Sequence, residues 1–336
     1  MNQSVISLLI CPNCSFQELK LEPYTIEGDD IYEGSLLCPA CHTWYRIENG
    51  IVDLLPLSLR RNDLYQIFAI KHKLPLDILE GSELQENEKS KQIDFFEDAD
   101  DYEKRVVNSP FYKALDQVAF FDWIKRNLNV EDQILVLDVG CGTGRQCIPL
   151  AQHHIKTIGI DISEEMLILA RKKINNLGLN HMIDLIMGDG ENPPFRDNCF
   201  SACIFYGTLH HLPNPQTAIA NASKKIVKNG LFYSLDPHKS SVRFIFDFLM
   251  KIWKIYDEEA SDAPLLSEKK LKGWLSNAGI KADTKLSTYL PPHLFMFTNV
   301  KVNAKLLRIS DSILGTIPVI RKIGGVIISE GVKQAS

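Results

Sequence analysis

The sequence lacks a long hydrophobic run. No stretch of about 18 uncharged apolar residues occurs. The most apolar stretch, residues 242–256, is interrupted by Arg243, Asp247, Lys251 and Lys254. This absence excludes a membrane-spanning helix. The N-terminal residues also lack the basic segment of a signal peptide. We therefore expect a cytoplasmic protein, with peripheral contact to a membrane left open.

The sequence also lacks an excess of positive charge. It has 37 Lys and Arg against 42 Asp and Glu, a net charge of −5, which argues against a generally nucleic-acid-binding surface. Residues 1–60 carry 3 basic and 8 acidic residues, and residues 61–110 carry 7 and 12. The remaining residues carry 27 and 22. The first third of the chain is therefore acidic, and the rest is mildly basic.

Four of the eight cysteines form two CxxC pairs: Cys11 with Cys14, and Cys38 with Cys41. A CxxC pair on a tight turn directs both sulfurs at one centre, and two pairs complete the tetrahedral thiolate shell that zinc prefers. Between the pairs, residues 19–37 alternate in the manner of a hairpin. We predict a structural zinc ribbon, because four thiolates leave no open position for catalysis. The alternative is two disulfides in a secreted domain.

This segment resembles the short zinc-ribbon family that includes the activator subunit of tRNA and protein methyltransferases. The resemblance is carried by LLICPNC (8–14) and LLCPACHTWYRIENGIVDLLP (36–56), and it spans about residues 4–58. It implies the ribbon fold. It also leaves open a protein partner that binds through the ribbon.

A glycine-rich loop follows an apolar strand in the passage QILVLDVGCGTGRQCIPLA (133–151). The strand is a continuous apolar run, as in parallel sheets covered on both faces. Glycines at 140, 142 and 144 allow a tight turn and a close approach to a ligand at the N-terminus of the following helix. Dinucleotide-binding enzymes use similar loops, so this pattern alone does not identify the ligand.

Acidic residues lie at the ends of the next two predicted strands. The predicted strand within 155–163 ends at Asp161, and the predicted strand within 181–189 ends at Asp189. An acid at the tip of the second strand is placed to accept hydrogen bonds from ribose hydroxyls. A fourth strand is predicted in the first part of residues 198–212. A loop follows its carboxyl end, where ligands bind in sheets of this type.

The motifs DVGCGTG, GIDIS, GDGENPPF and LHHLPNP stand in this order and closely resemble class I S-adenosylmethionine (SAM) methyltransferases of the group that contains ubiquinone and menaquinone methyltransferases. The resemblance spans residues 110–236. It implies an α/β, Rossmann-like, seven-stranded sheet with SAM as the methyl donor. A nicotinamide-dependent enzyme, the nearest rival, would carry GxGxxG where this loop reads GCGTGR. The residues that the resemblance places at SAM are Asp138, Gly140, Cys141, Gly142, Gly144, Asp161, Ile162, Asp189, Gly190 and Tyr206.

We divide the chain into a zinc ribbon (1–58), an acidic helical linker or cap (59–110) and a methyltransferase domain (111–336). Two additions are expected on the substrate side of that domain. Residues 239–264 follow the fifth strand, and residues 290–323 form a helical insertion between the last two strands. Their apolar and basic character predicts a small-molecule, lipid-linked or sugar-linked acceptor.

Methyl transfer from a sulfonium is an in-line displacement that depends mainly on positioning, with a base needed only where the acceptor carries a proton. The candidates for that base are His210, His211 and His238. RNA methylation is the alternative function, but a ribbon that docks on phosphate should be basic. A non-catalytic SAM-binding or partner module is a further alternative, which the intact glycine loop and Asp161 disfavour.

Overall fold

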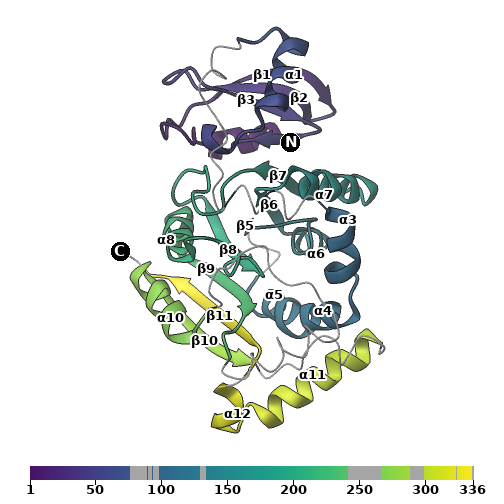
Figure 1. The fold of residues 1–336 in the computed structure, drawn as a ribbon, viewed down its shortest axis with the longest axis vertical. Coiled ribbons are helices and arrows are strands. Elements are labelled where there is room, and N and C mark those ends of the chain that lie inside the picture. Colours follow the sequence, from purple (N-terminus) through teal and green to yellow (C-terminus); the bar gives the residue numbers. More distant parts are fainter. Residues whose placement is uncertain are drawn as a thin grey trace.

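The computed structural model describes residues 1–75, 89, 93, 98–128, 134–240, 266–287, 299–322 and 324–334. Among these residues one mixed sheet of 11 strands runs through the molecule, in the order β1-β2-β3-β4-β7-β6-β5-β8-β9-β11-β10 (Figure 1). The strands are β1 (Lys20–Glu27), β2 (Asp30–Leu37), β3 (Trp44–Glu48), β4 (Ile51–Asp53), β5 (Leu135–Val139), β6 (Lys156–Asp161), β7 (Ile183–Met187), β8 (Phe200–Tyr206), β9 (Ile226–Pro237), β10 (Ile280–Ser287) and β11 (Val326–Lys333).

Strands β5 to β11 form the predicted Rossmann-like arrangement. Strands β7, β6, β5, β8 and β9 are parallel, and β11 inserts antiparallel between β9 and β10. The parallel strands are short and almost wholly buried, because helices cover both faces. The predicted seven strands of this sheet are confirmed as β5 to β11, and the four ribbon strands extend the sheet to 11.

The ribbon joins the sheet through one parallel strand pair. Ile51 of β4 lies opposite Leu185 of β7, and Val52 lies opposite Ile186. Strand β7 would otherwise be an edge strand with unpaired backbone groups, which proteins usually cover or protect. The ribbon therefore closes the edge of the sheet beside the carboxyl end of β7.

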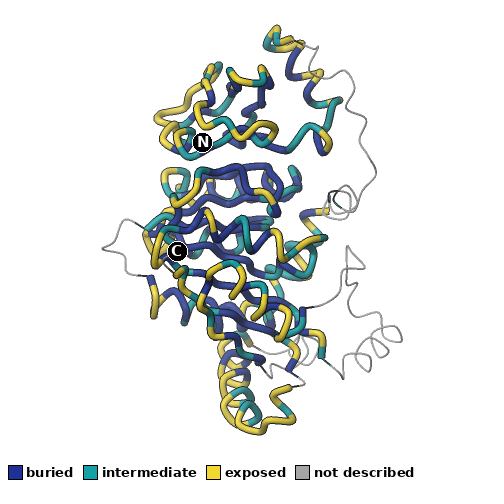
Figure 2. The backbone as a smooth tube through the Cα atoms, turned by 90° about the vertical axis from the view of Figure 1, so that its left-hand side faces the viewer, coloured by how far each residue is buried: buried dark blue, intermediate teal, exposed yellow. Residues whose placement is uncertain are grey.

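Two layers of helices flank the sheet (Figures 1 and 2). Helices α8 and α10 share one hydrophobic cluster with strand side chains such as Leu137 and Ile158. On the other face, α4, α5 and α11 pack against Val136 and Ile204, and α6 and α7 pack beside Leu185. These helices are α4 (Pro110–Leu115), α5 (Phe121–Asn127), α6 (Cys147–Gln152), α7 (Glu164–Asn176), α8 (Pro215–Lys225), α10 (Glu268–Asn277) and α11 (Val300–Leu314), and two shorter or outer ones are α1 (Asn62–His72) and α3 (Ala99–Tyr102).

The predicted helical insertion lies between β10 and β11. It contains α11 and the short helix α12 (Pro318–Lys322). Buried Ala304 and Leu307 hold α11 in the cluster that includes α4. The addition predicted at 239–264 lies outside the described residues, apart from its first two positions. In the described part of the chain, no helix is long and apolar enough to cross a membrane.

Candidate cofactor and metal sites

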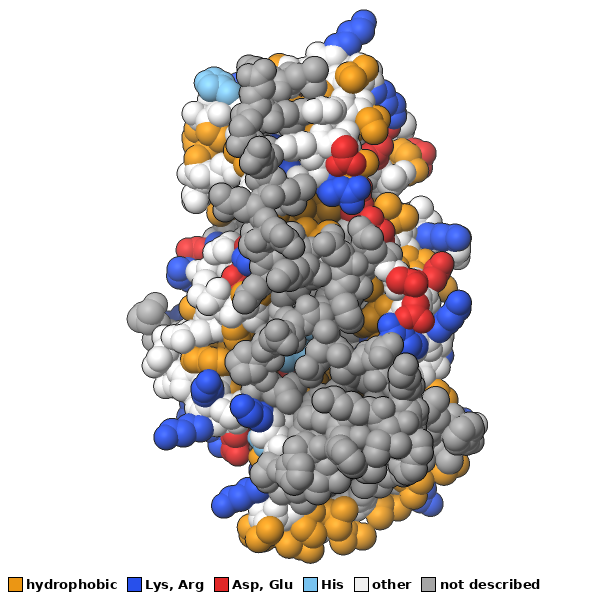
Figure 3. Space-filling view, viewed as in Figure 1, with side chains coloured by type: hydrophobic (Ala, Val, Ile, Leu, Met, Phe, Trp, Pro, Cys, Tyr) orange, Lys and Arg blue, Asp and Glu red, His pale blue; other side chains and the backbone are white. Residues whose placement is uncertain are grey.

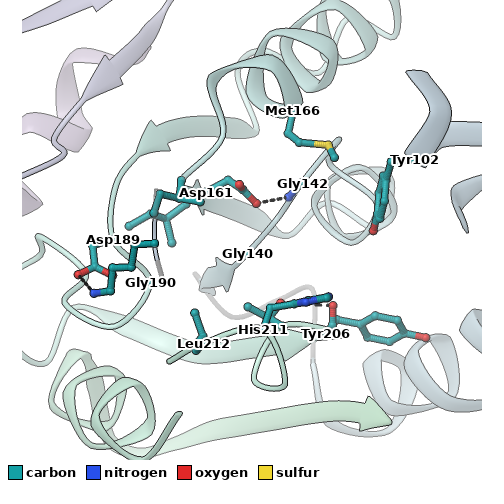
Figure 4. Close-up of a pocket in the computed structure, with 15 residues that line it drawn as sticks. Tyr102, Gly140, Gly142, Asp161, Met166, Asp189, Gly190, Tyr206, His211 and Leu212 are labelled. Carbon is teal, nitrogen blue, oxygen red and sulfur yellow. Dashed lines mark hydrogen bonds and ion pairs between the residues drawn. The ribbon is translucent and has the colours of Figure 1, made fainter. Parts of the chain in front are cut away.

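A cavity opens at the carboxyl ends of the central parallel strands (Figure 4). The empty space between its walls, open solvent included, is about 750 Å³. Its lining comes from the loops after β5, β6, β7 and β8 and from the acidic segment before α4. The lining residues are Lys89, Tyr102, Gly140, Gly142, Ile160, Asp161, Ile162, Met166, Asp189, Gly190, Tyr206, Gly207, Thr208, His211 and Leu212.

The glycine loop after β5 depends on backbone angles that favour glycine. Gly140 has φ of +72°, and a Cβ atom there would lie 2.4 Å from Thr208 Cγ2. Gly142 has φ of +49°, and the nearest atom to its added Cβ is Tyr102 Cε1 at 3.8 Å. The first glycine is therefore required by packing between the loops after β5 and β8. The second keeps the backbone open toward the cavity.

Asp161 connects the tip of β6 to this loop. Its Oδ2 accepts a hydrogen bond from the Gly142 backbone N–H at 2.7 Å, and its Oδ1 accepts one from the Ser163 N–H at 3.0 Å. Ser163 then caps α7 by accepting from the Met166 N–H at 3.2 Å. Burial raises the pKa of Asp161 above its ordinary value, against the opposing effect of these backbone hydrogen bonds. The carboxylate is held in one orientation at the cavity wall (Figure 4).

Asp189 lies at one end of the cavity and pairs with a lysine from the acidic segment. Lys89 Nζ is 2.7 Å from Asp189 Oδ2 and 2.9 Å from Glu191 Oε2. Both carboxylates are nearly buried. Their attraction outweighs the desolvation of the ammonium group, so the pKa of Lys89 is raised. The same ion pair also borders a second, open cleft beside Pro56.

Tyr102 and Tyr206 lie at the other end of the cavity (Figure 4). Arg145, which follows the glycine loop, supports Tyr206 from behind: its guanidinium carbon is 5.0 Å from the ring centroid. Arg145 also makes two hydrogen bonds to the carboxylate of Asp116, at 2.8 and 3.1 Å. The cavity thus runs from a charged end at Asp189 to an aromatic end at Tyr206.

The four ribbon cysteines come together as predicted. Their sulfur atoms all lie within 4.8 Å of one another. Cys11 and Cys41 are 3.6 Å apart, and Cys14 and Cys38 are 3.5 Å apart. Zinc–sulfur bonds of about 2.3 Å in a tetrahedron place sulfurs roughly 3.8 Å apart. The cluster therefore fits a tetrahedral zinc ion.

Comparisons with known proteins agree on the central domain. Residues 137–234 match the family model described as a methyltransferase domain. The chain is 27% identical over 194 residues to a demethylmenaquinone methyltransferase of Staphylococcus saprophyticus, covering 50% of this chain and 82% of that protein. It is 33% identical over 95 residues to a phosphatidylethanolamine N-methyltransferase of Cereibacter sphaeroides, covering 28% of this chain and 46% of that one.

The chain carries the methyltransferase domain of SAM-dependent enzymes. A structural comparison agrees on the fold. The chain superposes on a structure described as a complex between the Haloferax volcanii Trm112 methyltransferase activator and the putative methyltransferase, with a TM-score of 0.50 and 14% identity. That match covers 74% of this chain and 99% of the other. At this identity the likeness shows the fold alone.

The cavity of this methyltransferase fits SAM. Asp161 presents a fixed carboxylate at the tip of β6, where a ribose would lie. Gly142 leaves room between its backbone and the Tyr102 ring. At Gly190 an added Cβ would lie 2.9 Å from Val139 Cγ1. Glycine at this position is therefore explained by close packing against β5.

The predicted SAM residues divide into two groups. Seven of them line the cavity: Gly140, Gly142, Asp161, Ile162, Asp189, Gly190 and Tyr206. The other three, Asp138, Cys141 and Gly144, lie beneath it. Asp138 is buried and accepts a hydrogen bond from Cys147 Sγ at 3.2 Å, and burial raises its pKa to about 7.

The three histidines occupy different positions. His211 lines the cavity, and burial, with the neighbouring His210, lowers its pKa well below the ordinary value. His210 Nδ1 lies 2.9 Å from Asp236 Oδ1 at the end of β9, and burial raises the pKa of Asp236. His238 is buried, and its Nδ1 is 2.8 Å from the Gly324 carbonyl oxygen. This contact ties β9 to the start of β11 and favours a structural role for His238.

Sequence reasoning missed two cavity residues from the acidic segment. Lys89 and Tyr102 precede α4 in the chain, yet both line the cavity. The segment is anchored by Glu103, which accepts from Thr143 Oγ1 at 2.7 Å and pairs with Lys173 at 3.0 Å. The only signal in the sequence was charge, because Lys89, with Lys91 close by, stands among many acidic residues. Its partner Asp189 is 100 positions away.

Proposed function

We propose that this methyltransferase transfers the methyl group of SAM to a small apolar acceptor, such as a quinol or a lipid-linked compound. The observation that supports this most is the similarity to a demethylmenaquinone methyltransferase along half of the chain. The cavity adds support, because Tyr102, Met166 and Tyr206 give one end an aromatic and apolar wall. Such a wall suits an acceptor with a ring or a hydrocarbon group.

The lining of the cavity supports the following assignment of the residues that would hold SAM. SAM supplies an electrophilic methyl group on a sulfonium when it is bound. Asp161 would accept hydrogen bonds from the ribose hydroxyls, and Asp189 would accept one from the adenine amino group. The glycine loop would lie along the methionine part. This orientation directs the aromatic end of the cavity toward the acceptor.

His211 is the best-placed base for an acceptor that carries a proton. Its lowered pKa keeps the imidazole neutral near pH 7, so a ring nitrogen is able to accept a hydrogen bond. Its ring lies 3.8 Å, centroid to centroid, from that of His210. His210 is in turn oriented by Asp236. We therefore assign His211 as the base and His210 as a positioning residue.

In this proposal the ribbon binds one structural zinc ion and stabilises the methyltransferase domain of the same chain. Its strand β4 already pairs with β7. Arg46 on β3 also reaches across to Glu164 of α7, with an N–O distance of 2.7 Å. Both contacts lie beside loops that line the cavity. We infer that zinc keeps these strands in place and so supports the SAM site.

The experiment that tests the function is calorimetric titration with S-adenosylhomocysteine, followed by transfer of labelled methyl from SAM to a demethylmenaquinol analogue. Asp161→Asn removes the charged acceptor of the ribose hydrogen bonds, so we expect binding about 10- to 100-fold weaker. Asp197→Asn, outside the cavity, is the matched control. Absence of S-adenosylhomocysteine binding would refute the SAM site. Label found in RNA and absent from the quinol would refute the proposed acceptor.

A further inference from the structure

Helix α11 carries an apolar stripe on its outer surface. Val302, Leu306, Ile309 and Ile313 recur at the spacing of one helical face. They are exposed to 50%, 43%, 43% and 59%. The stripe continues beyond the helix at Ile317 and Val319, which are also exposed. Soluble surfaces seldom gather this many apolar side chains in one line, so the stripe needs a reason.

The fold itself does not use this stripe. The inner face of α11 is a separate set of residues, in which Asn303, Ala304 and Leu307 are buried. Ala304 and Leu307 pack in the cluster that contains α4 and α5. The inner face therefore already attaches the helix to the domain. The outer apolar side chains remain exposed in the folded chain.

Positive charge accompanies the stripe. Residues 299–322 contain five basic residues, Lys301, Lys305, Arg308, Arg321 and Lys322, and one acidic residue, Asp311. Asp311 accepts a hydrogen bond from Ser287 Oγ at 2.9 Å. The chain as a whole has a net charge of −5. This segment is thus locally basic in an acidic protein.

The segment forms an outer edge of the molecule, at the end opposite the ribbon (Figure 1). In the space-filling view the same edge shows a row of apolar side chains with basic ones beside it (Figure 3). Helix α11 has 15 residues, which is too short to span a bilayer. Apolar side chains flanked by lysine and arginine are the pattern of a helix that lies in the plane of an anionic membrane surface.

We propose that the face formed by α11 and α12 docks on an anionic lipid bilayer. The apolar stripe enters the boundary between headgroups and acyl chains. Arg308 pairs with Asp122 of α5 at 3.1 Å, and the four lysine and arginine side chains that remain face the lipid phosphates. The charge favours lipid over a symmetric pairing of two such faces, because two basic faces repel each other whereas lipid phosphates attract them. Docking rests on the proposed function, since a lipid-soluble acceptor resides in such a bilayer. Binding of the protein to the bilayer is nevertheless measured without any acceptor present.

Sedimentation with vesicles of phosphatidylcholine, with and without phosphatidylglycerol, tests this proposal on the full chain. We expect the protein to pellet with the anionic vesicles and much less with the neutral ones. The variant Ile309→Glu with Ile313→Glu should weaken binding at least about tenfold, because two exposed apolar anchors become charged. The matched control is Ile67→Glu with Ile70→Glu, two exposed isoleucines on α1 at the far end of the molecule. The control should bind as the wild type does.

A second variant tests the electrostatic part. Lys305→Glu with Lys322→Glu should lower affinity for anionic vesicles about fivefold or more for each residue, and leave binding to neutral vesicles unchanged. Failure of the wild type to bind anionic vesicles, or equal binding by all variants, would overturn the proposal. So would a dimer that is lost in the Ile309→Glu and Ile313→Glu variant without any vesicle binding. Vesicle binding with no S-adenosylhomocysteine binding would refute the proposed function and leave the docking face standing.

Discussion

Replacement of Gly140 by alanine should destabilise the protein more than the same change two residues later. At Gly140 the new Cβ meets Thr208 Cγ2 at 2.4 Å and Oγ1 at 2.6 Å, with φ at +72°. The left-handed backbone costs alanine about 1–2 kcal/mol, and the overpacking adds about 1–3 kcal/mol. At Gly142 the backbone is also left-handed, but the nearest atom is 3.8 Å away. Only the backbone cost of about 1–2 kcal/mol applies there.

Urea unfolding followed by circular dichroism measures both variants. The side chain of Thr208 supplies the atoms that clash with the new Cβ in the Gly140→Ala variant. Adding Thr208→Gly to Gly140→Ala should recover about 1–3 kcal/mol relative to the sum of the single changes, which a double-mutant cycle reports. Equal loss for the Gly140→Ala and Gly142→Ala variants, or no coupling with Thr208, would refute this account of the loop.

Three further outcomes are expected. Because burial raises the pKa of Asp138 from 3.8 to about 7, the native state retains a proton that the unfolded chain loses, and stability falls as pH rises between about 4 and 7. Asp138→Asn should abolish this fall. The change in unfolding free energy between pH 4 and pH 8, measured by urea titration, should then be about 4 kcal/mol more favourable in the variant than in the wild type. Cys41→Ser should remove the bound zinc detected by elemental analysis and lower the unfolding midpoint, whereas Cys199→Ser, outside the cluster, should keep the metal. Lys89→Met leaves two nearly buried carboxylates without their cation and should cost about 3 kcal/mol of unfolding free energy. The exposed Lys71→Met should cost far less, and equal losses would contradict the role of burial.

The residue types and their local spacing were sufficient to predict those parts of the protein whose residues are contiguous in the chain. The apolar run before Gly140 identified a buried strand, and the glycines identified a turn at its end. The acids Asp161 and Asp189 each end or follow such a run, so their place at the carboxyl edge follows from parallel strand geometry alone. The spacing within each CxxC pair likewise points two sulfurs at one centre.

Contacts between distant segments needed the tertiary structure. Nothing in the local pattern of residues 51–53 indicates that they pair with β7, because strand pairing depends on what other edges are available. Lys89 and Tyr102 come from an acidic segment with no clear periodicity, and only folding brings them to the cavity.

Side-chain direction was the other matter that the sequence left undecided. Asp138 belongs to the same motif as Gly140, yet it is buried against Cys147 and does not line the cavity. The direction of the side chains on α11 was likewise undecided. Apolar residues recur around much of that helix, and only its packing against α4 shows which of them the core uses and which remain exposed.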